Sequence, residues 1–426
     1  MKRKPPTDPP GTHPAPTETR LSGLQIALRP LESLRTGRFR IYFLSMGLVF
    51  AGMQMNQMAR LWFVYELTKS PLLLGITAAG DAIPMLTLSL FGGALADRLP
   101  KRNIILVGQI CLAIMALAIA VDVKLGAIAW WHLALAAAFQ GAVMSFIMPS
   151  RQALISELVD RPQLLNAVSL STAEMNLNRI LAPALAGFLI AGIGIVAVFL
   201  VMAGMYATSF LVMLLLPATR PVRSERRTVL RDMGDTFGYI RHRPVLFQLL
   251  MAALVASLFG MPLQRLLPVF SEDVLKVGPS GLGLLLSLMG LGALIGSVLT
   301  ASLGDYQKKG LLFLILTLVF GAFIVAFSFS PIYLLSLALM LPVGVGSSGR
   351  STVNVTLLQA YVDDSFRGRV MSLYMMEHGL QPLGLLPIAA AAEVIGAPIA
   401  VGISGAIVAL YSLWALVFQP SLRKLA

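Results

Sequence analysis

The chain has 426 residues, of which 57% are hydrophobic and only 12% are charged. Soluble domains contain about 25% charged residues, so this composition excludes a soluble enzyme. One bilayer crossing takes about 20 apolar residues, and the hydrophobic content therefore matches roughly twelve spans. The net charge is +13. Cys111 is the single cysteine, which excludes a disulfide framework and a cysteine-rich metal site.

Residues 1–38 are rich in proline and contain no apolar core long enough for a secretory signal, which predicts a disordered cytoplasmic tail. Twelve apolar segments follow, at 40–66, 71–96, 103–124, 128–149, 164–191, 194–216, 245–270, 279–302, 310–330, 332–356, 370–394 and 398–418. We therefore expect an all-α membrane protein with two pseudo-symmetric six-helix bundles, 39–216 and 245–420, and a cytoplasmic tail at 421–426.

The longest loop, 217–244, is basic and contains an apolar stripe with helical spacing. The stripe consists of Val229, Leu230, Met233, Phe237 and Ile240. Such a helix suits the anionic cytoplasmic leaflet, so we expect a basic linker with an amphipathic helix between the bundles.

The distribution of basic residues predicts the topology. With the N-terminus inside, 27 of the 33 Lys and Arg residues fall in the tails and in the cytoplasmic turns. The others are Lys69, Lys124 and Lys276 on the opposite side, and Arg60, Arg179 and Arg265 inside spans. The positive-inside rule then places both termini of a multi-pass plasma-membrane protein in the cytoplasm, and it explains the charge without a nucleic-acid partner.

The two halves share short sequence matches. Val159, Asp160, Ser169 and Leu170 correspond to Val362, Asp363, Ser372 and Leu373 at a constant offset of 203, and Asp97 with Lys101 corresponds to Asp305 with Lys309 at 208. The matches lie in equivalent loops, which indicates a duplicated six-span unit, as in transporters built from repeats.

The loop at 93–102 reads GALADRLPKR. A carboxylate beside several cations at a helix end can hold a neighbouring helix N-terminus and release it on protonation. The loop resembles the signature loop of the major facilitator superfamily, which implies a conformational role for it. The residues of this conformational motif are Gly93, Asp97, Arg98, Lys101 and Arg102, with Asp305 in the second half. Cytoplasmic anchoring by basic residues is the simpler alternative.

Four further segments, 62–71, 151–159, 266–270 and 367–374, are similar to the transmembrane secretion effector branch of that superfamily, which includes macrolide-efflux proteins and the enterobactin exporter. The resemblance implies a monomeric, proton-driven exporter, a drug:proton antiporter. In the fifth span, Arg179, Pro183 and Gly187 belong to a stretch that resembles the superfamily's antiporter motif. Small residues and a proline there allow close packing or bending, and ordinary helix packing is the alternative.

Ionisable side chains inside the spans carry the main functional signal, because charge at depth is costly and normally faces a cavity or a partner. Asp81 and Glu174 lie about 15 Å into their spans, at 1.5 Å per residue, and Glu377 and His378 lie shallower. We expect these four residues to couple protons or substrate. The alternative is a static pair with a charge partner, which would be Arg60, Arg179 or Arg265.

Gln54, Asn56 and Gln57 in the first span are pocket candidates, although the neighbouring methionines also suit plain packing. The sequence contains no Walker A motif, zinc-ligand spacing or hydrolase elbow, so we expect no enzyme activity, no cofactor and no metal. The predicted partners are a small-molecule substrate, protons and membrane lipids.

The sequence thus predicts a proton-coupled exporter of a small amphipathic molecule, such as a drug or a siderophore, that works by alternating access. Two alternatives remain open. One is a lysophospholipid or lipid transporter of the same fold, and the other is a non-transporting receptor or assembly factor.

Overall fold

The computed structural model describes residues 33–96, 98–217, 238–303 and 306–425, and every regular element in these ranges is helical. The first bundle contains α2 (Gly37–Thr68), α3 (Pro71–Ala79), α4 (Ala82–Ala96), α5 (Lys101–Lys124), α6 (Trp130–Leu158), η2 (Arg161–Gln163), α7 (Leu164–Ile193) and α8 (Ile195–Leu214). The second contains α10 (Pro244–Gly260), α11 (Pro262–Val269), η3 (Phe270–Val274), α12 (Gly278–Ser302), α13 (Lys309–Ser328), α14 (Tyr333–Tyr361), α15 (Asp364–Ile395), α16 (Ala397–Phe418) and α17 (Pro420–Arg423).

These helices account for the twelve expected spans. Helices α3 and α4 form the second span, which is broken at Gly80 and Asp81, and α10, α11 and η3 follow one another in the seventh. Nine spans in the described part combine sufficient length with high mean hydropathy. The three long helices outside that group, α2, α14 and α15, are less apolar because they carry buried polar side chains, among them Arg60, Arg350 and Glu377.

The two bundles are built alike, as the repeat predicted. The turn between α7 and α8 has Gly194 at φ 87°, and the turn between α15 and α16 has Gly396 at φ 86°. Glycine adopts this backbone region without the steric penalty that a Cβ atom brings. The same device therefore joins the last two helices of each bundle.

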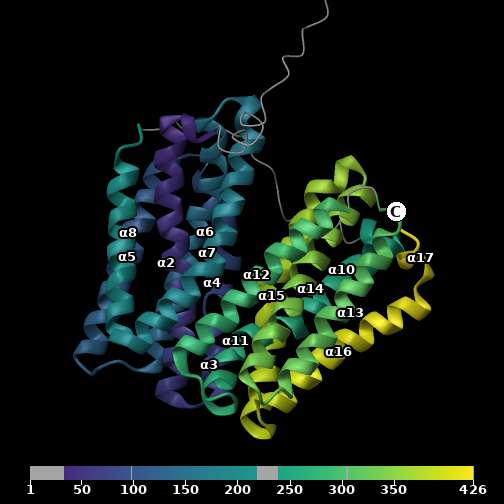
Figure 1. Cartoon of the computed structure of the whole chain (residues 1–426). Coiled ribbons are helices and arrows are strands. Elements are labelled where there is room, and N and C mark those ends of the chain that lie inside the picture. The colour runs from purple at the N-terminus through teal and green to yellow at the C-terminus, as the bar shows by residue number, and fades with distance from the viewer. Residues whose placement is uncertain (1–32, 97, 218–237, 304–305, 426) are drawn as a thin grey trace, which may run out of the picture.

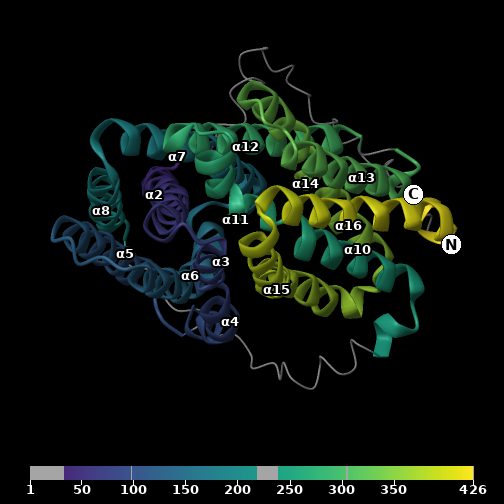
Figure 2. The ribbon, with the colours of Figure 1, turned by 90° about the horizontal axis from the view of Figure 1, so that it is seen from below.

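The ribbons of the two bundles converge at one end and diverge at the other (Figure 1). Figure 2 views the molecule from the converging end, with α3 and α11 between the bundles. We call this the closed end; α2 ends there and α3 begins there. One apolar core continues through the first bundle into the second, whereas a separate core around Leu246, Leu357 and Leu422 lies in the second bundle alone.

Two seams join the bundles. In the first, α7 packs against α12, and small residues let the backbones approach closely: a Cβ at Gly187 would overlap the backbone of Pro279, and one at Gly283 would overlap the backbone of Pro183. In the second, α15 packs against α3 and α4. The antiporter-like stretch around Pro183 and Gly187 therefore belongs to a contact between bundles.

The described structure includes parts of both predicted tails. Within the predicted tail 1–38, residues 33–38 are described, and Ser33 Oγ donates a 2.6 Å hydrogen bond to Asn166 Oδ1. The tail at 421–426 is also docked, with Leu422 fully buried and the Leu425 carbonyl accepting from Gly310 N–H. Of the amphipathic stripe in the linker, Ile240 is buried, and the residues before 238 lie outside the described part.

We predict that Gly187→Ala destabilises the protein by about 1–3 kcal/mol, because the added methyl group must push α7 away from α12. Gly192→Ala is the matched control, since Gly192 lies in the same helix with open space around it and gains the same helix propensity. Thermal unfolding of the purified variants measures the difference. Equal melting temperatures would contradict close backbone contact at this seam.

Candidate functional site

The conformational motif lies at the end of the first bundle where the two bundles diverge. Lys101, at the start of α5, is buried and pairs with Glu157 near the end of α6. The Arg102 guanidinium donates to the carbonyl of Leu214 at 2.8 Å, and Arg98 is exposed. These contacts tie the ends of three helices within one bundle. Gly93 lies in α4, and Asp97 and Asp305 lie outside the described residues.

Polar contacts join the bundles at the closed end, between the last turn of α2 and η3. The Tyr65 hydroxyl donates to Asp273 Oδ2, and Lys69 Nζ lies 3.0 Å from Glu272 Oε1. The sequence did not indicate that these four residues meet, because the contacts form only where the two bundles pack together.

Glu393, near the end of α15, binds the start of α3 across the second seam. Its Oε2 accepts from Ser70 Oγ at 2.8 Å and from the Leu72 N–H at 3.0 Å. Ser70 is also the N-cap of α3, since its Oγ accepts from the Leu73 N–H. A carboxylate at a helix N-terminus is stabilised by the helix dipole and by the free N–H groups. Glu393 thus closes the molecule by capping a helix of the other bundle.

Asp81 lies at the break in the second span, beside a buried polar cluster. Gly141 of α6 lets the backbone of Asp81 approach, since a Cβ there would overlap it. Arg60, which is 1% exposed, lies 3.7 Å from Asp81 Oδ2 and donates to Gln140 Oε1 at 2.9 Å. Asn56 donates to the same Gln140 oxygen at 2.8 Å. The structure therefore brings together Asp81, Arg60 and Asn56 from the predicted set.

Other predicted residues are not part of this cluster. Arg179 lies in α7, where its backbone faces Gly290 of α12 across the first seam. Gln54 and Gln57 are half-buried in α2. His378 lies in α15, and the position of its side chain is outside the described part.

Glu174 of α7 faces α2 and has a charged neighbour that the sequence did not reveal. Its carboxylate packs against Gly47, where a side chain would overlap it, and Arg151 of α6 acts on it electrostatically together with Tyr42. The Arg151 guanidinium lies 4.9 Å from the ring centre of Phe50. One oxygen of Glu174, Oε2, is buried without a hydrogen bond from the described residues.

Glu377 of α15 repeats this arrangement in the second bundle, 203 positions later. It is 8% exposed, and Arg350 of α14 is its charged neighbour, with Tyr374 alongside. Arg350 is 2% exposed and lies 5.1 Å from the ring centre of Phe320. Each bundle therefore holds one carboxylate, half-buried for Glu174 and buried for Glu377, with an arginine from the preceding helix.

The predicted charge distribution was wrong for two arginines. Arg151 and Arg350 were counted with the cytoplasmic turns, but both are buried within helices. The predicted span 128–149 ends at Pro149. In the structure, α6 continues through this proline to Leu158, and Arg151 is buried. A proline inside a helix usually ends or kinks it, which is why the sequence pattern misled. Arg350 had a visible signal, since it lies within the segment 332–356.

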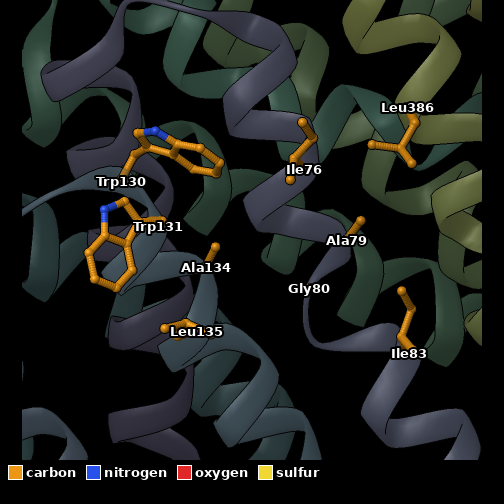
Figure 3. Close-up of a pocket in the computed structure, with 9 residues that line it drawn as sticks. All are labelled: Ile76, Ala79, Gly80, Ile83, Trp130, Trp131, Ala134, Leu135 and Leu386. Carbon is orange, nitrogen blue, oxygen red and sulfur yellow. The ribbon is translucent and has the colours of Figure 1, made fainter.

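An apolar pocket of about 440 Å³ lies beside the second seam (Figure 3). The first bundle contributes residues of α3, α4 and α6, including Trp130 and Trp131, and α15 contributes Leu386. Several lining side chains also face outward, with Ile83 65% exposed and Leu135 60% exposed. The pocket therefore opens onto the outer surface of the helices.

The two six-helix bundles and their arrangement are those of the major facilitator fold. Residues 28–425 match the model of the transmembrane secretion effector family. The chain therefore belongs to this family, as the sequence motifs predicted, and it is a multi-pass membrane transporter and not an enzyme.

Curated relatives of this chain are exporters or transporters. It is 26% identical over 362 residues to the staphyloferrin A transporter of Staphylococcus aureus, covering 84% of this chain and 90% of the relative. The multidrug efflux pump Tap of Mycolicibacterium fortuitum is also 26% identical, with coverages of 85% and 91%. The enterobactin exporter EntS of Citrobacter koseri is 26% identical, with coverages of 72% and 72%.

Solved structures support the fold. The nucleoside transporter NupG superposes with a TM-score of 0.75 at 12% identity, covering 89% of this chain and 99% of that chain. At this identity the likeness concerns the fold alone.

We predict that Glu393→Gln shifts the molecule toward opening at the closed end. The amide loses the charge that interacts with the α3 N-terminus, which is worth ~1 kcal/mol or about a fivefold change in the ratio of two conformations. Distances between spin labels on the ends of α3 and α15 measure the shift. Glu66→Gln is the control, since Glu66 is exposed at the same end of α2. Unchanged distances in Glu393→Gln would contradict a closing role for this contact.

Proposed function

We propose that this transporter exports a small amphipathic molecule, such as a drug or a siderophore, against inward proton flow by alternating access. The observation that carries the proposal is the joining of two bundles at one end while each bundle holds a partly or fully buried carboxylate beside an arginine. Similarity to a multidrug efflux pump and to an enterobactin exporter supports an efflux role for this chain.

We infer that the closed end faces outward and the diverging end faces the cytoplasm. Basic residues support this orientation, because the starts of α2, α5 and α13 and the end of α16 lie at the diverging end (Figure 1). Arg98, Lys101 and Arg102 lie at or near the start of α5, and Lys308 directly precedes α13. By the positive-inside rule this end is cytoplasmic. The described conformation would then be open toward the inside, ready to take up cargo.

Protonation of Glu174 or Glu377 is the proposed coupling step. A charged carboxylate attracts its neighbouring arginine, and that attraction disappears when the carboxylate is neutral. Each pair joins two helices, α6 with α7 or α14 with α15, and α7 and α15 both belong to a seam between the bundles. A proton on either carboxylate would therefore alter the packing of a helix on which the closed end depends. The proton shifts the balance between the open and closed conformations only if it binds them with different affinities.

We predict that Glu174→Gln and Glu377→Gln each lower substrate-driven proton movement by about tenfold, within the usual range of coupling free energies. Glutamine keeps the shape of the side chain and cannot exchange a proton. Acid-loaded inside-out vesicles that contain the protein report proton release after addition of a cationic dye, a macrolide or a catecholate siderophore.

Glu66→Gln serves as the control, because Glu66 is an exposed carboxylate outside both pairs. Substrate transport with full pH dependence in the Glu174→Gln variant would remove Glu174 from the coupling step, and the same holds for Glu377. If both variants behave like Glu66→Gln, neither pair couples protons.

One observation favours lipid movement as a second candidate. The apolar pocket beside α3, α6 and α15 lies at a seam between the bundles, and its lining includes outward-facing side chains. An acyl chain would fit such a lining. Movement of a fluorescent lysophospholipid in proteoliposomes, blocked by Ala134→Trp, would favour this candidate over the export of a water-soluble cargo.

A further inference from the structure

Two arginines, one from each bundle, lie on helices that pack together near the closed end. Arg60 belongs to α2, and Arg265 belongs to α11, which packs against α2 and α3. Arg60 is almost fully buried, Arg265 is half-buried, and the two guanidinium groups repel each other. Like charges are brought together in a low-dielectric interior only at a considerable free-energy cost.

The negative charge near this pair does not balance it. Asp81 is the carboxylate of the described residues that acts on Arg60, and its Oδ2 lies 3.7 Å away, longer than a hydrogen bond. Gln140 is neutral and already accepts from both Arg60 and Asn56. The Nε of Arg60 and the Nη1 of Arg265 are buried and donate to no acceptor among the described residues. Arg60 thus has one carboxylate nearby, and Arg265 forms no ion pair with a described residue.

We propose that Arg60 and Arg265 form a binding site for a carboxylate group of the transported molecule. The proposal rests on the proposed export function and adds the chemical class of the cargo. A guanidinium group presents N–H donors in a planar fork that matches the two oxygens of a carboxylate. A carboxylate between the two arginines would supply the acceptors that their buried donors need and neutralise the excess positive charge.

The position of the site connects binding to conformation. Since Arg60 belongs to the first bundle and Arg265 to the second, one carboxylate bridges the two bundles beside the Tyr65–Asp273 and Lys69–Glu272 contacts. Binding there stabilises the conformation in which the closed end is shut, because the two arginines meet only when the bundles do. Asp81 competes with the ligand for Arg60, so it weakens binding.

The test measures binding to the full-length purified protein, independently of transport. The probes are citrate, succinate and benzoate, with tetraphenylphosphonium as the cationic comparison, and the readout is a saturable rise in melting temperature. We expect at least one carboxylate probe to stabilise the wild-type protein and the cation to have no such effect.

Three variants sharpen the test. Arg265→Gln should weaken carboxylate binding by about tenfold or more, and Asp81→Asn should strengthen it, since it removes the competing charge. Arg161→Gln is the matched control, an exposed arginine far along the sequence from the site. Arg60 is left unchanged because its burial makes it a structural residue as well. A merely structural role for Arg265 and Asp81 would not give changes of opposite sign.

Absence of stabilisation by every carboxylate probe, or equal stabilisation of the wild-type and Arg265→Gln proteins, would overturn the proposed site. Its failure is distinguishable from that of the export function. Proton-coupled efflux of a cationic dye without carboxylate binding would overturn the anion site alone. Carboxylate binding that responds to both variants would support the site even if the vesicles released no protons.

Discussion

Burial of charge in a low-dielectric interior constrains this structure more than any other interaction. An ionised group without a partner in such an interior is costly by several kcal/mol, so each buried charge must lie where another polar or aromatic group reaches it. Arg60 lies against Gln140 and Asp81, and Arg151 and Arg350 each lie over a phenylalanine ring. Two of these three arginines lie in α2 and α14, which are long helices outside the group of nine highly apolar spans in the described part.

The same constraint connects the buried charges to movement. Tight seams with small residues hold α7 against α12 and α15 against α3 and α4, and the polar contacts of Glu393 and Asp273 secure the closed end. Surface contacts of this kind are each worth little, so a modest change in charge is enough to tip the balance between two conformations. A close-packed seam combined with weak polar contacts suits a molecule that must open and close repeatedly.

Much of the fold was predictable from the sequence. Hydropathy gave all twelve spans to within a few residues at most ends, and the 203-residue offset predicted the repeat that now relates Glu174 to Glu377. The break at Gly80 and Asp81 was not predicted, because the surrounding residues form a continuous apolar run. Arg151 was misplaced for a physical reason: tertiary packing keeps α6 helical beyond Pro149.

The site was less predictable than the fold. Asp81 and Arg60 were recognised as a possible pair from their depth in the membrane, and the structure places them 3.7 Å apart. The approach of Arg265 to Arg60, and of Glu393 to Ser70, depends on how two separate bundles pack. Such contacts join positions hundreds of residues apart, and no local pattern in the sequence encodes them.

The central claim is that the closed end must open during transport. Its most direct test is a short cross-link between Ser70→Cys and Glu393→Cys in a background without Cys111, because these residues are in contact only when that end is shut. The account predicts that cross-linked protein loses substrate transport and regains it when a reducible link is cleaved. Full transport activity with the link intact would contradict it.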